Sequence, residues 1–192
     1  LALYSFLIAD RQPWGSSAAR VARCLMAVFA GIAVLAKGPV GVLLPVLVVA
    51  VYLTLRRAWR AWLRPGSLLA MVSLFLGVVL PWYVAAARVN GEAFVGGFLG
   101  FSNLQRFTSV LYAHPGPPWF YLPWLLLLLL PWSLFLPLAL GRHEFWNRER
   151  WRDLLQRRDD EDPLALFLLI WLVVVMGFFS AAATKLPGYI LP

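Results

Sequence analysis

Two lysines are the residues of this chain most suited to act on a ligand, because each interrupts an apolar run. Lys37 is followed by Gly38 and Pro39, and Lys185 begins the sequence Lys-Leu-Pro-Gly-Tyr that ends at Tyr189. A lysine at membrane depth is costly and usually has a partner, although a long side chain can also reach the interface and keep its charge in water. Two interpretations of each lysine therefore stay open: it binds a ligand, or its side chain reaches the membrane surface without one.

The balance of charge around these lysines predicts an anionic ligand. The basic residues expected on their side of the membrane are Lys37, Arg88, Arg106 and Lys185. Glu92 is the one carboxylate expected there. Arg106 suits forked contacts with phosphate oxygens, Lys185 can supply a point charge, and Tyr189 can donate a hydrogen bond. We therefore predict a site for a phosphate group that carries a lipid tail.

Other kinds of active site find no support in the sequence. It contains no P-loop, no Gly-x-Ser-x-Gly elbow and no His-Glu-x-x-His motif. His114 and His143 fall on opposite predicted sides, and the single cysteine, Cys24, excludes an internal disulfide and a multi-cysteine metal site. The acidic run at 159–162 is interpreted as a solvated segment before a helix. We name no catalytic residue and no metal ligand.

The elements that position these residues are predicted to be transmembrane helices. Of the 192 residues, 61% are hydrophobic and 14% charged, with a mean hydropathy of +0.75; a soluble domain has about 45–50% and about 25%. The apolar runs are continuous rather than alternating, which favours helices over barrel strands. They are Leu1–Ala9, Cys24–Ala36, Val40–Leu55, Leu68–Ala87, Trp119–Leu140 and Leu164–Ala183. We predict an all-α, multi-pass bundle whose last three runs are full-length helices.

The distribution of basic residues predicts the topology. If Lys37–Pro39 is a tight turn, thirteen of the seventeen basic residues lie on one side and four on the other. A single crossing from Cys24 to Leu55 would place ten basic residues on one side and six on the other, and it would leave Lys37 in lipid. The positive-inside rule therefore favours the turn and places 141–163 in a cytoplasmic loop. Topology and anionic lipid headgroups account for the basic charge, so no nucleic-acid partner is expected.

The predicted outer loop, 88–118, is the longest segment on the side of the lysines. Its apolar residues from Phe94 to Leu104 recur every three to four positions, which predicts an amphipathic helix in the membrane interface with Asn90 as its N-cap. A loop helix that packs on the bundle fits equally well. Aromatic residues suited to the interface follow it: Trp119, Tyr121 and Trp124.

Three motifs together resemble the polyprenol-phosphate-dependent glycosyltransferases of family 39. The first is Leu-Ala-Lys-Gly-Pro-Val-Gly at 35–41. The second is Asn-Leu-Gln-Arg-Phe at 103–107, followed by His-Pro-Gly-Pro-Pro-Trp-Phe-Tyr-Leu-Pro at 114–123. The third is Lys-Leu-Pro-Gly-Tyr-Ile-Leu-Pro at 185–192. The family includes protein O-mannosyltransferases and the bacterial aminoarabinose transferases that modify lipid A, and the chain looks most like the latter.

This resemblance implies a GT-C fold in the bacterial inner membrane with an active site facing the periplasm. Such enzymes pass a hexose or pentose from a polyprenyl-phosphate donor to a lipid or protein acceptor. Arg106 and Tyr189 match positions that contact the donor phosphate, with Lys185 close by, and Lys37 lies in the first motif. The family's catalytic aspartate lies upstream, so we expect residues 1–192 to be an internal part of one transmembrane domain, inactive alone.

Two questions stay open at this stage. Some relatives hold a divalent metal partly through a histidine beside the second motif, where this chain has Ser102 and Asn103. We assign no metal ligand, and a divalent metal is the one cofactor that the resemblance suggests. The main alternative function is a transporter or flippase of lipid-linked anions, which would use the same cations without chemistry. The third hypothesis for the function is a structural membrane subunit that binds no ligand.

Overall fold

The computed structural model describes residues 1–94, 116–143, 147–149, 151 and 163–190. Every regular element in these ranges is helical, which confirms the predicted all-α class. The chain divides into two units, Leu1–Asn103 and Leu104–Pro192, and each is described by itself.

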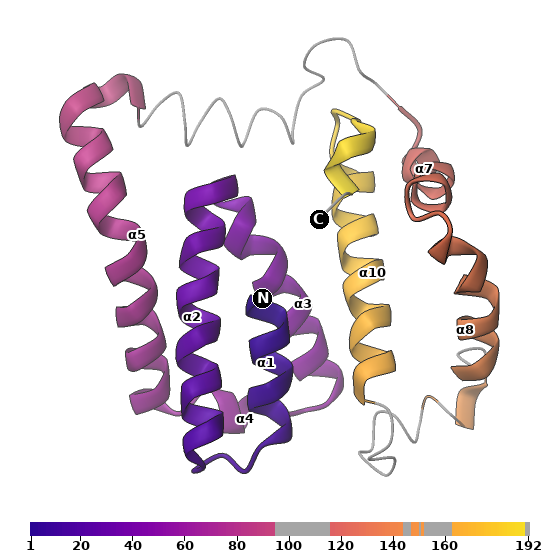
Figure 1. The fold of residues 1–192 in the computed structure, drawn as a ribbon, viewed down its shortest axis with the longest axis horizontal. Helices are drawn as coiled ribbons and strands as arrows, with labels where there is room; N and C mark the ends of the chain where they lie inside the picture. The colour runs from indigo at the N-terminus through magenta and orange to yellow at the C-terminus, as the bar shows by residue number, and fades with distance from the viewer. Residues whose placement is uncertain (95–115, 144–146, 150, 152–162, 191–192) are drawn as a thin grey trace. The chain divides into compact units, whose positions relative to one another are not determined.

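The first unit is built around one central helix, α2. Its elements are α1 (Ala2–Arg11), α2 (Ser17–Lys37), α3 (Val40–Leu55), α4 (Trp59–Trp62) and α5 (Pro65–Phe94). The hydroxyl of Ser16 accepts a hydrogen bond from the Ala19 amide at 3.1 Å and so caps the start of α2. Helix α2 contacts α1, α3 and α5, and Figure 1 shows it between α5 and the other two.

The predicted tight turn between α2 and α3 is confirmed. Gly38 has φ 70° and ψ −160°, a conformation that side chains with a Cβ rarely adopt, and its N–H donates to the Val34 carbonyl at 2.8 Å. A Cβ on Gly41 would overlap the Ala33 carbonyl oxygen and lie 2.5 Å from its carbon. The two helices can therefore approach this closely only because Gly41 has no side chain.

Aromatic side chains from three helices form the packed centre of the first unit. Phe6 of α1 is fully buried, and its ring centroid lies 5.6 Å from Tyr52 of α3 and 4.6 Å from Trp62 of α4. Asp10 joins the same elements, because its two carboxylate oxygens accept hydrogen bonds from the Tyr52 hydroxyl at 3.2 Å and the Trp62 indole N–H at 3.1 Å. One carboxylate thus ties α1 to both α3 and α4.

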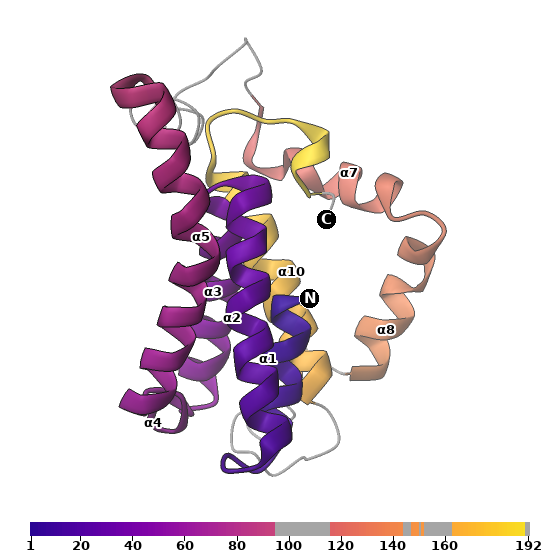
Figure 2. The same cartoon turned by 60° about the vertical axis from the view of Figure 1, so that its left-hand side comes forward.

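A buried arginine lies near the same end of the unit. Arg23 is 5% exposed; its guanidinium donates to the Trp14 carbonyl at 3.1 Å and lies 4.0 Å from the centroid of the Trp14 ring. Arg64 lies 5.0 Å from the same ring. Figure 2 shows α4 and the α1–α2 connection at one end of the unit. Cation–π contacts therefore add to the packing there.

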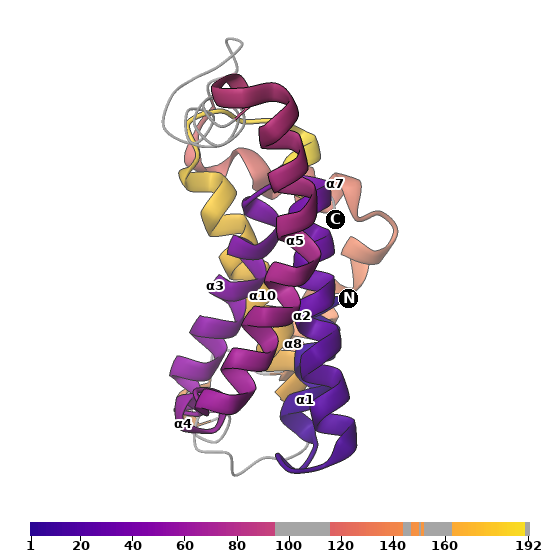
Figure 3. The same cartoon turned by 90° about the vertical axis from the view of Figure 1, so that its left-hand side faces the viewer.

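Helix α5 packs along α2 and ends in a break. A Cβ on Gly31 of α2 would lie 2.9 Å from the Cβ of Val78, and Figure 3 shows α5 running along α2. Gly91 has non-helical angles, φ 60° and ψ −148°. Asn90 is the last residue before this break, and its side-chain amide donates back to the Ala86 carbonyl at 2.9 Å. The predicted role of Asn90 as an N-cap was wrong, and the rest of the predicted interfacial helix lies outside the described residues.

The second unit contains a long helix and a sharply bent pair. Its elements are η2 (Pro118–Phe120), α7 (Tyr121–Leu128), η3 (Trp132–Phe135), α8 (Leu136–His143), α10 (Pro163–Ala181) and η4 (Pro187–Ile190). The segments Pro118–Leu128 and Trp132–Arg142 are bent by 105°. The predicted continuous helix over Trp119–Leu140 was therefore wrong. Pro131 has no amide hydrogen for the preceding turn, and the helix breaks there.

Within the described ranges, three helices are long and apolar enough to cross a membrane: Ser17–Lys37, Pro65–Gly91 and Pro163–Ala181. Counting the bent pair as one span gives four. Helix α3 is apolar but shorter, at 16 residues. The chain is thus a membrane protein segment with several candidate spans, as the apolar runs predict.

Candidate functional site

Lys185 lies just beyond the carboxyl end of α10, and its side chain turns back onto that helix. It is 5% exposed. Its ammonium donates hydrogen bonds to three backbone carbonyls: those of Phe179 at 3.3 Å, Ser180, and Ala182 at 2.7 Å. The last carbonyls of a helix lack intrahelical donors and carry partial negative charge, so a cation is stabilised there. Burial nevertheless lowers the pKa of the Lys185 ammonium.

Tyr189 follows in the short helix η4 and packs against the same end of α10. Its ring centroid lies 5.6 Å from that of Phe179, with 34° between the ring planes. The side chain is half-buried. Its hydroxyl makes no hydrogen bond with any residue that the structure describes, so this phenol is held by its ring while its polar end remains able to donate.

Tyr121 connects the start of α7 to the loop after Lys185. It is fully buried, and its hydroxyl accepts a hydrogen bond from the Leu186 amide at 3.2 Å. Its ring centroid lies 5.9 Å from the Lys185 ammonium nitrogen and 6.2 Å from the Phe179 ring. Two segments separated by 65 residues are therefore fastened together beside Lys185.

Gly116 approaches Lys185 from the segment before α7. A Cβ at this position would lie 2.8 Å from the Lys185 Cγ and 3.2 Å from its Cβ. Distances below 3.0 Å force a neighbour to move. The glycine of the His-Pro-Gly-Pro-Pro sequence thus lets this segment lie directly against the stem of Lys185.

The second unit brings together two of the four predicted phosphate-binding residues. Lys185 and Tyr189 share the end of α10. Lys37 is exposed at the last position of α2, in the first unit. Arg106 lies outside the described residues, as do Ser102 and Asn103 of the same motif. Among the described residues, no group of three His, Cys, Asp or Glu side chains could hold a metal ion.

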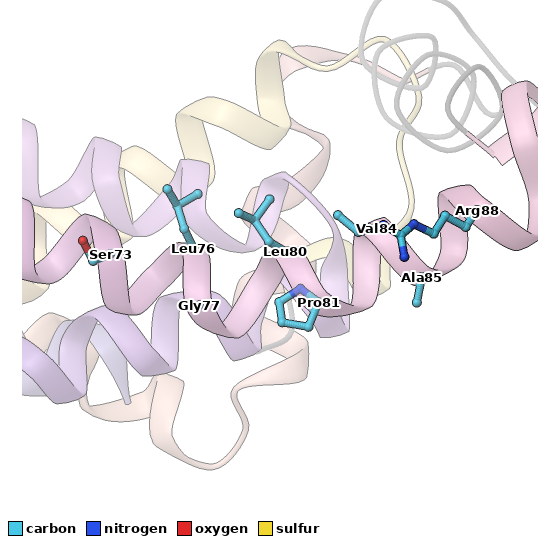
Figure 4. Close-up of a pocket in the computed structure, with 8 residues that line it drawn as sticks. All are labelled: Ser73, Leu76, Gly77, Leu80, Pro81, Val84, Ala85 and Arg88. Carbon is cyan, nitrogen blue, oxygen red and sulfur yellow. The ribbon is translucent and has the colours of Figure 1, made fainter.

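A hollow of the first unit lies along α5. It has a volume of about 540 Å³, and Figure 4 shows the side chains that line it along the helix. Its lining residues are Ser73, Leu76, Gly77, Leu80, Pro81, Val84, Ala85 and Arg88. All of them belong to one helix, and none is a nucleophile paired with a base. This groove supplies no catalytic group.

Two residues of the site were not assigned a role from the sequence. From the sequence, Tyr121 was grouped with the aromatic residues suited to the membrane interface, and Gly116 stood only as part of the second motif. Both lie within the second motif, so the motif itself was the signal. Their contacts with Lys185 and Leu186 join segments distant in sequence, which spacing along one element does not reveal.

Comparison with known proteins confirms the predicted resemblance. No family model matches the chain. It is 36% identical over 168 residues to the undecaprenyl phosphate-alpha-4-amino-4-deoxy-L-arabinose arabinosyl transferase of Pseudomonas paraeruginosa, and 35% identical over 168 residues to that of an Enterobacter species. Each match covers 88% of this chain and 28% of the relative. The chain thus spans less than a third of the length of these relatives.

Solved structures agree with these relatives. The crystal structure of ArnT from Cupriavidus metallidurans bound to undecaprenyl phosphate matches with a TM-score of 0.78 and 31% identity, and its apo structure with a TM-score of 0.73 and 30% identity. Both matches cover 98% of this chain and 31% of the ArnT chain. Over nearly its whole length, the chain is therefore a homologue of one part of the undecaprenyl-phosphate aminoarabinose transferases.

Proposed function

We propose that this chain forms the donor-phosphate region of a membrane enzyme that transfers 4-amino-4-deoxy-L-arabinose from undecaprenyl phosphate to a lipid A-like acceptor. The active site would face the periplasm of the bacterial inner membrane. The observation that carries the proposal is the structural match to ArnT, which covers 98% of this chain. That ArnT structure contains bound undecaprenyl phosphate. The sequence relatives add the sugar, because their names include it.

The proposed chemistry is stabilisation of the leaving group. As the bond between the sugar and the donor phosphate breaks, negative charge grows on the phosphate oxygens. Donors and cations arranged in advance lower the energy of that state. We assign Arg106 to a forked contact with the phosphate, Tyr189 to a hydrogen bond from its hydroxyl and Lys37 to a supply of positive charge. Lys185 lies at the same end of α10 as Tyr189. The half-buried ring of Tyr189 and its unengaged hydroxyl support this assignment.

We assign neither the catalytic carboxylate nor a metal ligand to residues 1–192. The resemblance places the family's catalytic aspartate in the first periplasmic loop, upstream of residues 1–192. For a divalent metal we assign no ligand, since the described residues contain no group of three His, Cys, Asp or Glu side chains that could hold one. The enzyme should therefore be tested as the full-length protein.

The test compares site variants with matched controls in the full-length enzyme. Arg106→Ala and Tyr189→Phe are assayed for sugar transfer from a lipid-linked donor, beside Arg148→Ala and Tyr4→Phe. Loss of a hydrogen bond to a charged group costs about 1.5–3 kcal/mol, which corresponds to a loss of about 10- to 150-fold in kcat/KM. The controls are exposed residues and should retain activity.

Three results would contradict the proposal in different ways. Full transfer in both site variants would remove Arg106 and Tyr189 from the donor site. If the protein moves the lipid-linked donor from one leaflet of a vesicle membrane to the other and never transfers the sugar, it is a flippase. Absence of both donor binding and transport in the wild-type protein would leave a structural membrane subunit.

A further inference from the structure

Lys185 was expected to meet a phosphate, but its ammonium is already fully engaged. An ammonium has three N–H donors, and three backbone carbonyls at the end of α10 accept from it. The residue is 5% exposed. A phosphate contact would require breaking one of these hydrogen bonds and uncovering the charge. The geometry is that of a lysine that caps the carboxyl end of a helix.

The loop after this cap is fixed by two further residues. The buried Tyr121 hydroxyl accepts the Leu186 amide at 3.2 Å, immediately after Lys185. Gly116 lies so close to Lys185 that an added Cβ would be 2.8 Å from its Cγ. We call Lys185, Tyr121 and Gly116 the Lys185 latch. Its three members hold the segment that begins at residue 185 against α10 and against the start of α7.

Tyr189 is the residue that this segment presents. It lies four positions after Lys185, and its ring packs on Phe179, whose own carbonyl accepts from Lys185. The Phe179 ring also lies 6.2 Å from that of Tyr121. The position of the Tyr189 phenol therefore depends on the same contacts that form the latch, while its hydroxyl has no partner among the described residues.

We infer that the Lys185 latch positions the Tyr189 hydroxyl for the donor phosphate, and that Lys185 acts through Tyr189 without touching the phosphate itself. This inference rests on the proposed function, because it needs Tyr189 to contact the donor. Lys185, Tyr121 and Gly116 are accordingly positioning residues. Their effect on the reaction should disappear when the Tyr189 hydroxyl is absent.

That dependence gives a test that a purely structural role would not pass. In the full-length enzyme, kcat and KM for the lipid-linked donor are measured for Tyr121→Phe, Tyr189→Phe and the double variant, with Tyr4→Phe as control. One neutral hydrogen bond is worth about 1 kcal/mol, so Tyr121→Phe alone should lower kcat/KM by about 5-fold. The double variant should be no less active than Tyr189→Phe alone. Tyr4 is 65% exposed, and its variant should be unchanged.

Lys185 variants extend the same logic. Lys185→Met removes the cap, and we expect its loss of kcat/KM also to vanish in a Tyr189→Phe background. If Lys185 instead binds the phosphate, its loss will multiply with that of Tyr189→Phe, and the inference is wrong. Because Lys185→Met can prevent folding, the Tyr121→Phe cycle decides the matter where that variant cannot be purified.

The outcomes separate the inference from the proposed function. If Tyr189→Phe retains full transfer, the donor-site assignment fails. A second outcome is that Tyr189→Phe loses transfer while Tyr121→Phe lowers kcat/KM by the same factor with and without the Tyr189 hydroxyl. In that case the donor-site assignment stands, and the inference that the latch acts through Tyr189 is wrong. Loss confined to backgrounds that keep Tyr189 supports both.

Discussion

Replacing Gly41 by alanine tests the turn that joins α2 to α3. The added Cβ would overlap the Ala33 carbonyl oxygen and lie 2.5 Å from its carbon and 3.0 Å from the Val34 nitrogen. All of these atoms are backbone, so no side chain can rotate away. Carbon atoms in favourable contact are about 3.5–4.0 Å apart, so α2 and α3 would have to separate by roughly 1 Å.

The cost can be bracketed from this geometry. Overpacking that shifts backbone destabilises a protein by about 1–3 kcal/mol, and occasionally by more. An alanine in a helix is itself better than glycine by about 1 kcal/mol, which offsets part of this cost. Gly77 of α5 is a matched control, because a Cβ there meets nothing within 4 Å. Gly77→Ala should gain the helix propensity without the clash.

Thermal denaturation of the purified protein in detergent measures both variants. A change of 1 kcal/mol shifts Tm by about 2–4 °C for chains of this size. Because both variants gain the helix propensity, we expect Gly41→Ala to melt about 2–12 °C below Gly77→Ala, which itself leaves Tm unchanged or raises it by about 2–4 °C. If Gly41→Ala were as stable as Gly77→Ala, the close approach of α2 and α3 would be refuted, and the turn at 37–40 with it.

Three further predictions follow from the first unit and from the topology. Gly31→Leu should overpack the contact between α2 and α5 and reduce the free energy of unfolding by about 1–3 kcal/mol, which lowers Tm by several degrees. An unchanged melting curve would contradict that packing. Arg23→Gln should cost about 1–3 kcal/mol, since it loses the Trp14 contacts, whereas the exposed Arg20→Gln should stay within about 0.5 kcal/mol in the same denaturation assay; equal effects would count against the buried role. In a cysteine-free background, Lys37→Cys should react with a membrane-impermeant maleimide only from outside and Arg148→Cys only from the cytoplasm; the reverse labelling would overturn the positive-inside assignment.

The sequence predicted the features that depend on neighbouring residues. The turn after Lys37 followed from a charge, a glycine and a proline between two apolar runs, and the structure confirms it. The long apolar runs likewise predicted the spans at α5 and α10. The break near Pro131 was missed, because a nearly unbroken run of leucines looks continuous and prolines are tolerated in many membrane helices.

The site shows where sequence reasoning stops. Lys185 was correctly singled out, but its three carbonyl partners depend on how the chain folds back over the end of α10. A lysine a few positions beyond a helix end is itself a capping signal, which could have suggested this geometry. The partner of Tyr121 lies 65 residues away, and no periodicity encodes that distance. The role of Arg106 stays a prediction.

Asp10 has a consequence for how the protein is made. Its carboxylate meets its two donors, Tyr52 and Trp62, only 42 and 52 residues later in the chain. Until those residues have been synthesised, α1 lacks both of these hydrogen-bond donors. The carboxylate therefore joins the start of the unit to its later helices only once α4 has been synthesised.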